Sequence, residues 1–284
     1  MYYIVIILAV VMFGGCFALN DAYRKLRTSS VSSSMESSFV GALAGLVVLL
    51  AISGFDVQAT PFTCCVALLS ALCGIGFMFC SLKALDTVNL SLYSLFSMLG
   101  GMVLPFFQGL SFYGEKITVA KIVCITFICI ALGFTVSPDK TRSNTAFYVG
   151  VFVLNGMSGA LSKIYASAPF EKTNAEWYSI WSAVFTATIS GALWLLLSKK
   201  ECGYTWKAFG IGALNGAINR FANFLLVIAL LHVEASVQYP LVTGGVIIAS
   251  TIICYFGKIK PSPKEILSVI FAFLGMLALF LIKI

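Results

Sequence analysis

Ten apolar runs, each close to the length of a membrane-spanning helix, follow one another along the chain with short polar connections. A helix rises 1.5 Å per residue, so about 20 residues cross the ~30 Å hydrocarbon core of a bilayer. The runs cover residues 3–20, 34–54, 62–83, 89–110, 118–136, 146–167, 175–198, 206–231, 235–256 and 264–282. The pattern predicts an all-α integral membrane protein with ten transmembrane helices.

The composition agrees with a membrane protein and excludes several other classes. Of the 284 residues, 60% are apolar and 10% are charged, whereas soluble proteins carry about 25% charged residues. The net charge of +7 comes from basic residues scattered between the apolar runs, which is typical of membrane loops and not of a nucleic-acid-binding surface. The nine cysteines lie mostly inside the runs, so we interpret them as small buried residues and expect neither a metal site nor a cofactor.

The chain divides near its middle into two halves, 1–137 and 145–284, joined by a polar linker at 138–144. Short sequence matches relate the halves at a nearly constant offset: Ala84-Leu85, Val88 and Ser91 recur as Ala229-Leu230, Val233 and Ser236, and Gly114 and Lys121 recur as Gly257 and Lys264. Each half holds five runs, an odd number, so the second half must cross the membrane in the opposite sense. We therefore predict two inverted five-helix repeats around a central cavity.

Several of these motifs resemble those of the EamA-type branch of the drug/metabolite transporter superfamily. They are the small pair Gly14-Gly15, then Lys83-Ala84-Leu85, Tyr113-Gly114-Glu115, and Phe256-Gly257-Lys258 in the second half. The resemblance covers the whole chain but departs at Lys258, where the family usually has Glu. It implies a ten-helix transporter in which the first four helices of each half line a central cavity and the fourth and fifth helices of each half are supporting elements.

The run 206–231 contains the strongest candidate for a site. Asn215, Asn219 and Asn223 recur every four residues, and Arg220 falls in the same sector of the helix. A guanidinium at mid-membrane costs between about 3 and 17 kcal/mol, so Arg220 must face a partner, a ligand or water. Arg220 could brace the bundle by pairing with a carboxylate, but the three amides beside it favour a substrate-lining role.

Other runs supply further candidates for substrate binding. Asn155 and Lys163 lie on one side of the sixth run, where Lys163 faces either the cavity or the membrane surface. Trp177 and Trp181 open the seventh run, as an interfacial belt or as a stacking wall for substrate. In the ninth run, Gln238 and Tyr239 precede Pro240, which is expected to kink the helix. The kink either borders a binding site or serves only the packing of the helix.

The function that these features predict is transport and not catalysis. The chain has a single histidine, His232, and no hydrolase or nucleotide-binding motif. The first run lacks the acidic residue by which small multidrug members of the superfamily export cations. Together with the basic residues Arg220 and Lys163, this favours a substrate that carries a negative charge. We expect a small polar metabolite bearing a carboxylate or phosphate, or a zwitterion such as an amino acid, with a lipid-linked sugar flippase or a cationic drug exporter as alternatives.

The expected setting is a bacterial-type inner membrane, with the bilayer and the small-molecule substrate as partners and with a monomer or a dimer as the assembly. Basic residues concentrate in the loops opposite the N-terminus, among them Arg27, Arg142 and Lys200. By the positive-inside rule the N-terminus is external, whereas the family resemblance implies a cytoplasmic one.

Overall fold

The computed structural model describes residues 2–27, 30–54, 56–85, 90–135, 145–197, 206–256 and 263–282. Within these ranges the chain is all-helical: α1 (Tyr2–Leu26), α2 (Val31–Ser53), α3 (Pro61–Leu85), α4 (Leu90–Phe112), α5 (Val119–Thr135), α6 (Thr145–Ser167), α7 (Ala175–Leu197), α8 (Trp206–Leu230), α9 (Ala235–Phe256) and α10 (Pro263–Leu281). The helices begin and end close to the predicted runs, except that α1 continues to Leu26 instead of ending near residue 20. The predicted linker 138–144, together with Val88, Gly257 and Lys258, lies outside the described residues.

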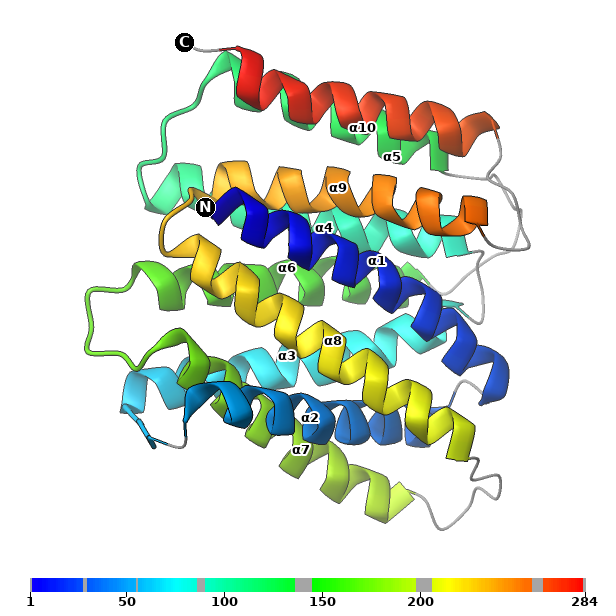
Figure 1. Ribbon diagram of the computed structural model, residues 1–284, viewed down its shortest axis with the longest axis vertical. Helices are drawn as coiled ribbons and strands as arrows, with labels where there is room; N and C mark the ends of the chain where they lie inside the picture. The colour runs from blue at the N-terminus through cyan, green and yellow to red at the C-terminus, as the bar shows by residue number, and fades with distance from the viewer. Residues whose placement is uncertain are drawn as a thin grey trace.

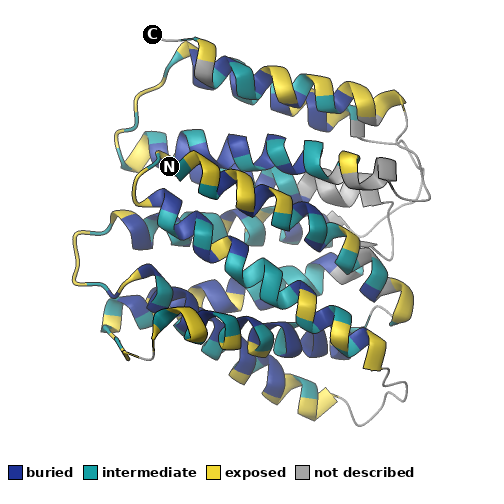
Figure 2. Cartoon of the chain, in the orientation of Figure 1, coloured by how far each residue is buried: buried dark blue, intermediate teal, exposed yellow. Residues whose placement is uncertain are grey.

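Six of these helices are long and apolar enough to cross a membrane, namely α1, α2, α3, α6, α7 and α8. Large apolar side chains cover the outside of the bundle, for example Ile4 on α1, Leu196 on α7 and Phe273 on α10, which are 71%, 74% and 52% exposed. Figure 2 shows such exposed residues along the outer face of α10. Apolar surface of this extent is unfavourable in water and favourable against lipid tails. The chain is a multi-pass membrane protein.

The helices lie side by side with their axes roughly along one direction, and both chain termini lie at the same end of the bundle (Figure 1). At one edge α5 packs against α10, next to α4 and α9. The helix α8 crosses the middle of the bundle and contacts α1 and α2. A long segment of α8 is therefore enclosed by other helices.

The packing partners largely repeat when α1–α5 are exchanged for α6–α10. The contact of α1 with α8 corresponds to that of α6 with α3, and the contact of α1 with α9 corresponds to that of α6 with α4. Three further pairs, α2 with α7, α4 with α9 and α5 with α10, are mapped onto themselves by the exchange. Two contacts depart from the pattern. The contact of α5 with α9 and that of α6 with α8 have no equivalents of similar extent in α10 with α4 and α1 with α3.

Glycines on both helices set the crossing of α2 and α8. A Cβ atom added at Gly216 would lie 2.0 Å from the Cα of Gly41, and one added at Gly45 would lie 2.6 Å from the Cγ of Arg220. Helix backbones approach this closely only where small residues face each other. The glycines therefore fix both the depth at which α8 sits against α2 and the position of Arg220.

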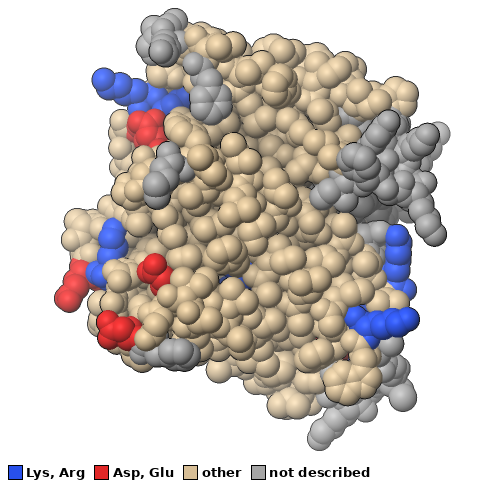
Figure 3. Space-filling view, in the orientation of Figure 1, with Lys and Arg blue, Asp and Glu red and all other residues tan. Residues whose placement is uncertain are grey.

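The two ends of the bundle differ in charge. Figure 3 shows acidic side chains, together with some basic ones, at the end that holds the termini, and basic side chains at the opposite end. The connections at the first end carry the acidic residues Asp56, Glu115, Glu171 and Glu234. At the opposite end the described residues include the exposed Lys25 and Lys207.

Candidate functional site

A cavity of about 370 Å³ lies within the bundle, a volume in the range of small-molecule sites. Described residues from α1–α4 and α6–α9 line it, and none from α5 or α10 does. Its polar lining consists of hydroxyls and amides together with one cation, Arg220, and no Asp, Glu or Lys is found among the described residues of the lining. The cavity therefore combines a single positive charge with many neutral hydrogen-bonding groups.

Arg220 reaches across the cavity wall to α7. Its Nη1 donates to the Oγ of Ser182 at 3.1 Å, and its Nη2 donates to the Oγ1 of Thr186 at 2.6 Å. The hydroxyl of Thr186 in turn donates to the carbonyl of Ser182 at 2.7 Å, so its oxygen is left to accept from the guanidinium. No described carboxylate forms an ion pair with Arg220, and its described partners are the two hydroxyls of α7.

Two of the three asparagines of α8 make contacts with each other, and the third makes contact with α1. Asn223 donates to the side-chain and backbone oxygens of Asn219 at 3.0 and 2.9 Å. Asn215 donates through Nδ2 to the Oδ1 of Asn20 at 2.8 Å, and its own buried Oδ1 has no hydrogen-bond partner among the described residues. All four side chains line the cavity.

Two tyrosines bound the cavity toward the end that holds the termini. The hydroxyl of Tyr178 lies 2.7 Å from that of Ser70, and its ring stacks on Tyr165 at a centroid distance of 4.2 Å. Tyr239 donates to the carbonyl of Gly159 at 2.8 Å. These bonds join α7 to α3 and α9 to α6 across the bundle, so the helices are tied together at this level.

Beyond these tyrosines, Glu115 connects the α4–α5 loop to α6 and α9. Its carboxylate lies 2.9 Å from the Nζ of Lys163 and accepts the backbone N–H groups of Ala235 and Ser236 at 3.0 and 2.9 Å. Burial alone would raise the pKa of Glu115, but the hydrogen bonds from Ser236 and the ion pair with Lys163 lower it below its usual value. The carboxylate also caps the N-terminus of α9, where the helix dipole favours negative charge.

The Tyr113-Gly114-Glu115 motif places this carboxylate. Gly114 has a φ of +62°, a left-handed conformation that lets the chain turn back after α4. A Cβ at Gly109 would lie 2.6 Å from Glu115 Oε2, so glycine there makes room for the carboxylate. The ring of Tyr113 lies 5.3 Å from the Nζ of Lys163, within reach of a cation–π contact.

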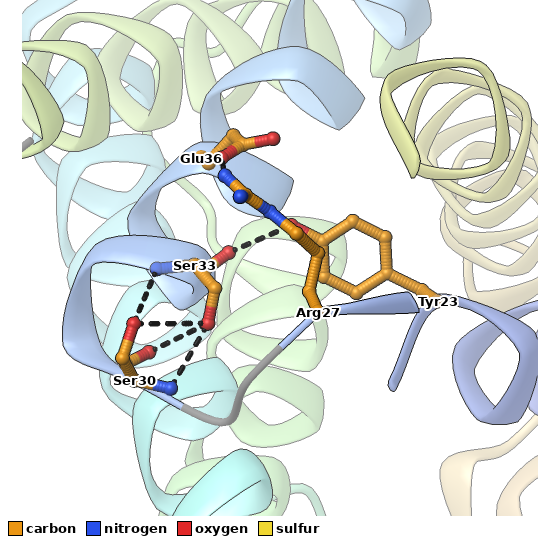
Figure 4. A network of polar contacts seen from close by, with 5 residues as sticks. All are labelled: Tyr23, Arg27, Ser30, Ser33 and Glu36. Atoms are coloured by element: carbon orange, nitrogen blue, oxygen red, sulfur yellow. Dashed lines mark hydrogen bonds and ion pairs between the residues drawn. The ribbon is translucent and has the colours of Figure 1, made fainter. Parts of the chain in front are cut away.

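A second network occupies the opposite end, between α1 and α2 (Figure 4). Arg27 pairs with Glu36, and the side chains are 13% and 2% exposed. Tyr23 donates to the carbonyl of Ser33 at 3.0 Å, and Ser30 caps α2 in a capping box with Ser33. Arg27 is therefore part of a buried ion pair and not the solvated loop charge that the sequence suggests.

The structure brings together six of the ten predicted site residues at the cavity and places the other four elsewhere. Those that line it are Arg220, Asn215, Asn219, Asn223, Tyr239 and Asn155. Lys163 does not line it and is neither at the cavity nor extended to the membrane surface, because Glu115 holds it.

The remaining three predicted residues serve packing between helices. Trp177 lies in the apolar core formed with α3 and α6. Trp181 donates through Nε1 to the carbonyl of Gln58 at 2.9 Å, in the α2–α3 connection. Gln238 is fully buried and donates to the carbonyl of Leu226 at 2.9 Å. None of the three lines the cavity.

Sequence reasoning missed the partners that other helices contribute. Ser182 and Thr186 stand four residues apart, with Ser179 one turn earlier, and this spacing was an available signal for a polar face on α7. Asn20 was assigned to the end of the first run, whereas α1 continues past it to Leu26. Tyr178 lies beside Trp177 at the start of the seventh run, whose aromatic residues the sequence predicts to form either an interfacial belt or a stacking wall for substrate.

Comparisons with known proteins support the fold and no more than the fold. A solved structure described only as the crystal structure of a protein is similar to this chain, with a TM-score of 0.72, 14% sequence identity, and coverage of 98% of this chain and 95% of its own. In all, 29 chains of solved structures match this chain significantly. No family model and no curated protein matches the sequence.

Proposed function

We propose that the protein is a secondary-active transporter that carries a small polar anionic or zwitterionic metabolite across the cell membrane. The observation that carries the proposal is Arg220, a cation in the middle of α8 that lines a polar cavity without a described carboxylate partner. A charge enclosed within a membrane-spanning bundle is unfavourable unless water or a ligand compensates it. A substrate carboxylate or phosphate at Arg220 would supply that compensation.

The mechanism that we propose is alternating access between two inverted repeats, each of five membrane-spanning helices. The correspondence of helix contacts between α1–α5 and α6–α10 supports it. So does a pair of equivalent alanines, both with 0% exposure: Ala84 clusters with Tyr148 and Val151 of α6, and Ala229 clusters with Ile6 and Ala9 of α1. In such a pair of repeats a site at their interface can face either side of the membrane in turn.

Two alternatives receive less support. A lipid-linked sugar flippase would stack a sugar on the aromatic residues of α7, but of these Tyr178 lines the cavity whereas Trp177 and Trp181 pack within the bundle. A cationic drug exporter would need a negative charge in the cavity, and its described lining has none. We propose no catalytic activity.

Counterflow in proteoliposomes tests the proposal. Vesicles loaded with an unlabelled carboxylate should take up the same compound in labelled form, and the uptake should fall at least tenfold with Arg220→Gln, which keeps a polar side chain and loses the charge. Uptake of quaternary ammonium compounds with no uptake of any anionic or zwitterionic metabolite would contradict it.

A further inference from the structure

A second polar feature of the cavity, formed by Asn215 and Asn20, lies away from Arg220. Asn215 lies five residues before Arg220 on α8, so their Cα atoms are separated by about 7.5 Å along the helix axis. Asn215 is only 8% exposed, and it meets Asn20 of α1 at 2.8 Å. The pair thus joins the two halves of the chain at a level of the cavity different from that of the guanidinium.

The Oδ1 atom of Asn215 is a buried acceptor with no described partner. A buried polar atom that lacks a hydrogen bond costs about 1–3 kcal/mol, so such atoms are rare unless a ligand or water satisfies them. Asn215 lines the cavity, so this oxygen belongs to a side chain that a ligand in the cavity would contact. A hydrogen-bond donor on a ligand would then supply the missing bond.

The charges of the lining restrict what that donor can be. Arg220 is the one charged side chain among the described residues of the cavity, and hydroxyls and amides make up the rest of its polar surface. An ammonium group at Asn215 would find no described carboxylate to neutralise it, and a second anionic group would find no second cation. Both would pay desolvation without a counter-charge.

We propose that the substrate is a singly charged anion with neutral hydroxyl or amide groups, bound through its anionic group at Arg220 and through a neutral donor at Asn215 and Asn20. This inference rests on the proposed function and narrows its substrate class. It favours hydroxylated or amide-bearing monocarboxylates over zwitterionic amino acids and over doubly charged anions.

Isothermal titration of the purified full-length protein with four six-carbon carboxylates tests the inference. Gluconate carries hydroxyls, hexanoate carries none, ε-aminocaproate ends in an ammonium group, and adipate ends in a second carboxylate. Gluconate should bind at least tenfold more tightly than each of the other three, a difference of about 1.4 kcal/mol. The comparison uses the unmodified protein, so it does not depend on the folding of a variant.

Asn215→Asp is a nearly isosteric variant that should shift the binding preference from gluconate toward ε-aminocaproate. Its carboxylate would accept from an ammonium group and repel an anion, so ε-aminocaproate should gain at least tenfold in affinity relative to gluconate. Thr126→Ala, on the exposed side of α5 and bonded only within its own helix, is the matched control and should bind as the parent does.

The outcomes separate the inference from the function on which it rests. If hexanoate, ε-aminocaproate or adipate binds as tightly as gluconate and the binding is lost in Arg220→Gln, the second subsite is wrong and the anion site stands. If the order of the ligands is the same in Asn215→Asp as in the parent, the role of Asn215 is wrong. If no carboxylate binds, or if binding survives in Arg220→Gln, both proposals are overturned.

Discussion

The carboxylate of Glu115 lies 2.9 Å from the ammonium group of Lys163, and the two side chains are 5% and 8% exposed. The pair joins the loop after α4, in the first half of the chain, to α6 in the second half. Because the same carboxylate caps α9, one residue holds three segments together at the end of the bundle that holds the termini.

We expect Glu115→Gln and Lys163→Met each to destabilise the protein by about 3–5 kcal/mol, because each leaves one buried charge without its partner. The double variant should lose less than the sum of the two. Thermal unfolding in detergent measures this cycle, with Glu171→Gln, an exposed residue of the neighbouring α6–α7 connection, as the control that changes stability little. Additive losses would show that the pair does not act as a unit.

Stability should also depend on pH through Glu115. The pKa of Glu115 is lower in the folded protein than in the unfolded chain. The ionised carboxylate therefore stabilises the fold at pH values above the unfolded-state pKa of about 4.3. This stabilisation is lost as the pH falls further, through the folded-state pKa. The difference in melting temperature between the parent and Glu115→Gln should therefore shrink below a pH of about 4.3. A difference that stays constant down to the lowest pH at which the protein folds would contradict the assignment.

Gly45→Ala should displace Arg220, since the new Cβ would lie 2.6 and 2.7 Å from the Cγ and Cβ of that side chain. We expect a loss of about 1–3 kcal/mol from overpacking and at least a tenfold loss of carboxylate binding. Gly210→Ala on α8 is the control, because a Cβ there meets no atom within 4 Å. It should leave binding unchanged and add up to about 1 kcal/mol of stability through helix propensity.

Arg27 and Glu36 should matter for stability as a pair at the opposite end. Glu36→Gln leaves the guanidinium of Arg27 partly buried without its counter-charge, and a loss of about 3 kcal/mol is expected. Ser38→Ala, two residues along α2, provides a comparison at a side chain that is only half-buried. Equal melting temperatures for Glu36→Gln and Ser38→Ala would show that the ion pair contributes little.

Both termini should lie on the same side of the membrane, since they lie at one end of the bundle. Basic residues are concentrated at the other end, which the positive-inside rule places in the cytoplasm, so the side that holds the termini is predicted to be external. Reporter fusions that fluoresce only in the cytoplasm should be dark at either terminus, and a cysteine introduced at Lys207 should be shielded from an impermeant reagent added outside. Reporters bright at both termini would reverse the orientation, and reporters of opposite sense would contradict the arrangement of the helices.

Much of the helical framework could be predicted from the sequence, because apolar length is a property of each segment alone. The run 206–231 and α8 agree to within one residue. The end of α1 could not be predicted in this way. Asp21 and Arg24 end the apolar run near residue 20, yet hydrogen bonding continues the helix to Leu26.

The sequence by itself determined that the chain enters a membrane as a series of helices and that Arg220 and the three asparagines share one sector of α8. Both follow from composition and from the angular period of a helix. Only the tertiary structure decided that Ser182, Thr186 and Asn20 meet this sector and that Lys163 is held by Glu115. Contacts of that kind depend on the rotation and crossing of helices far apart in the sequence, which close packing at residues such as Gly41 and Gly216 fixes.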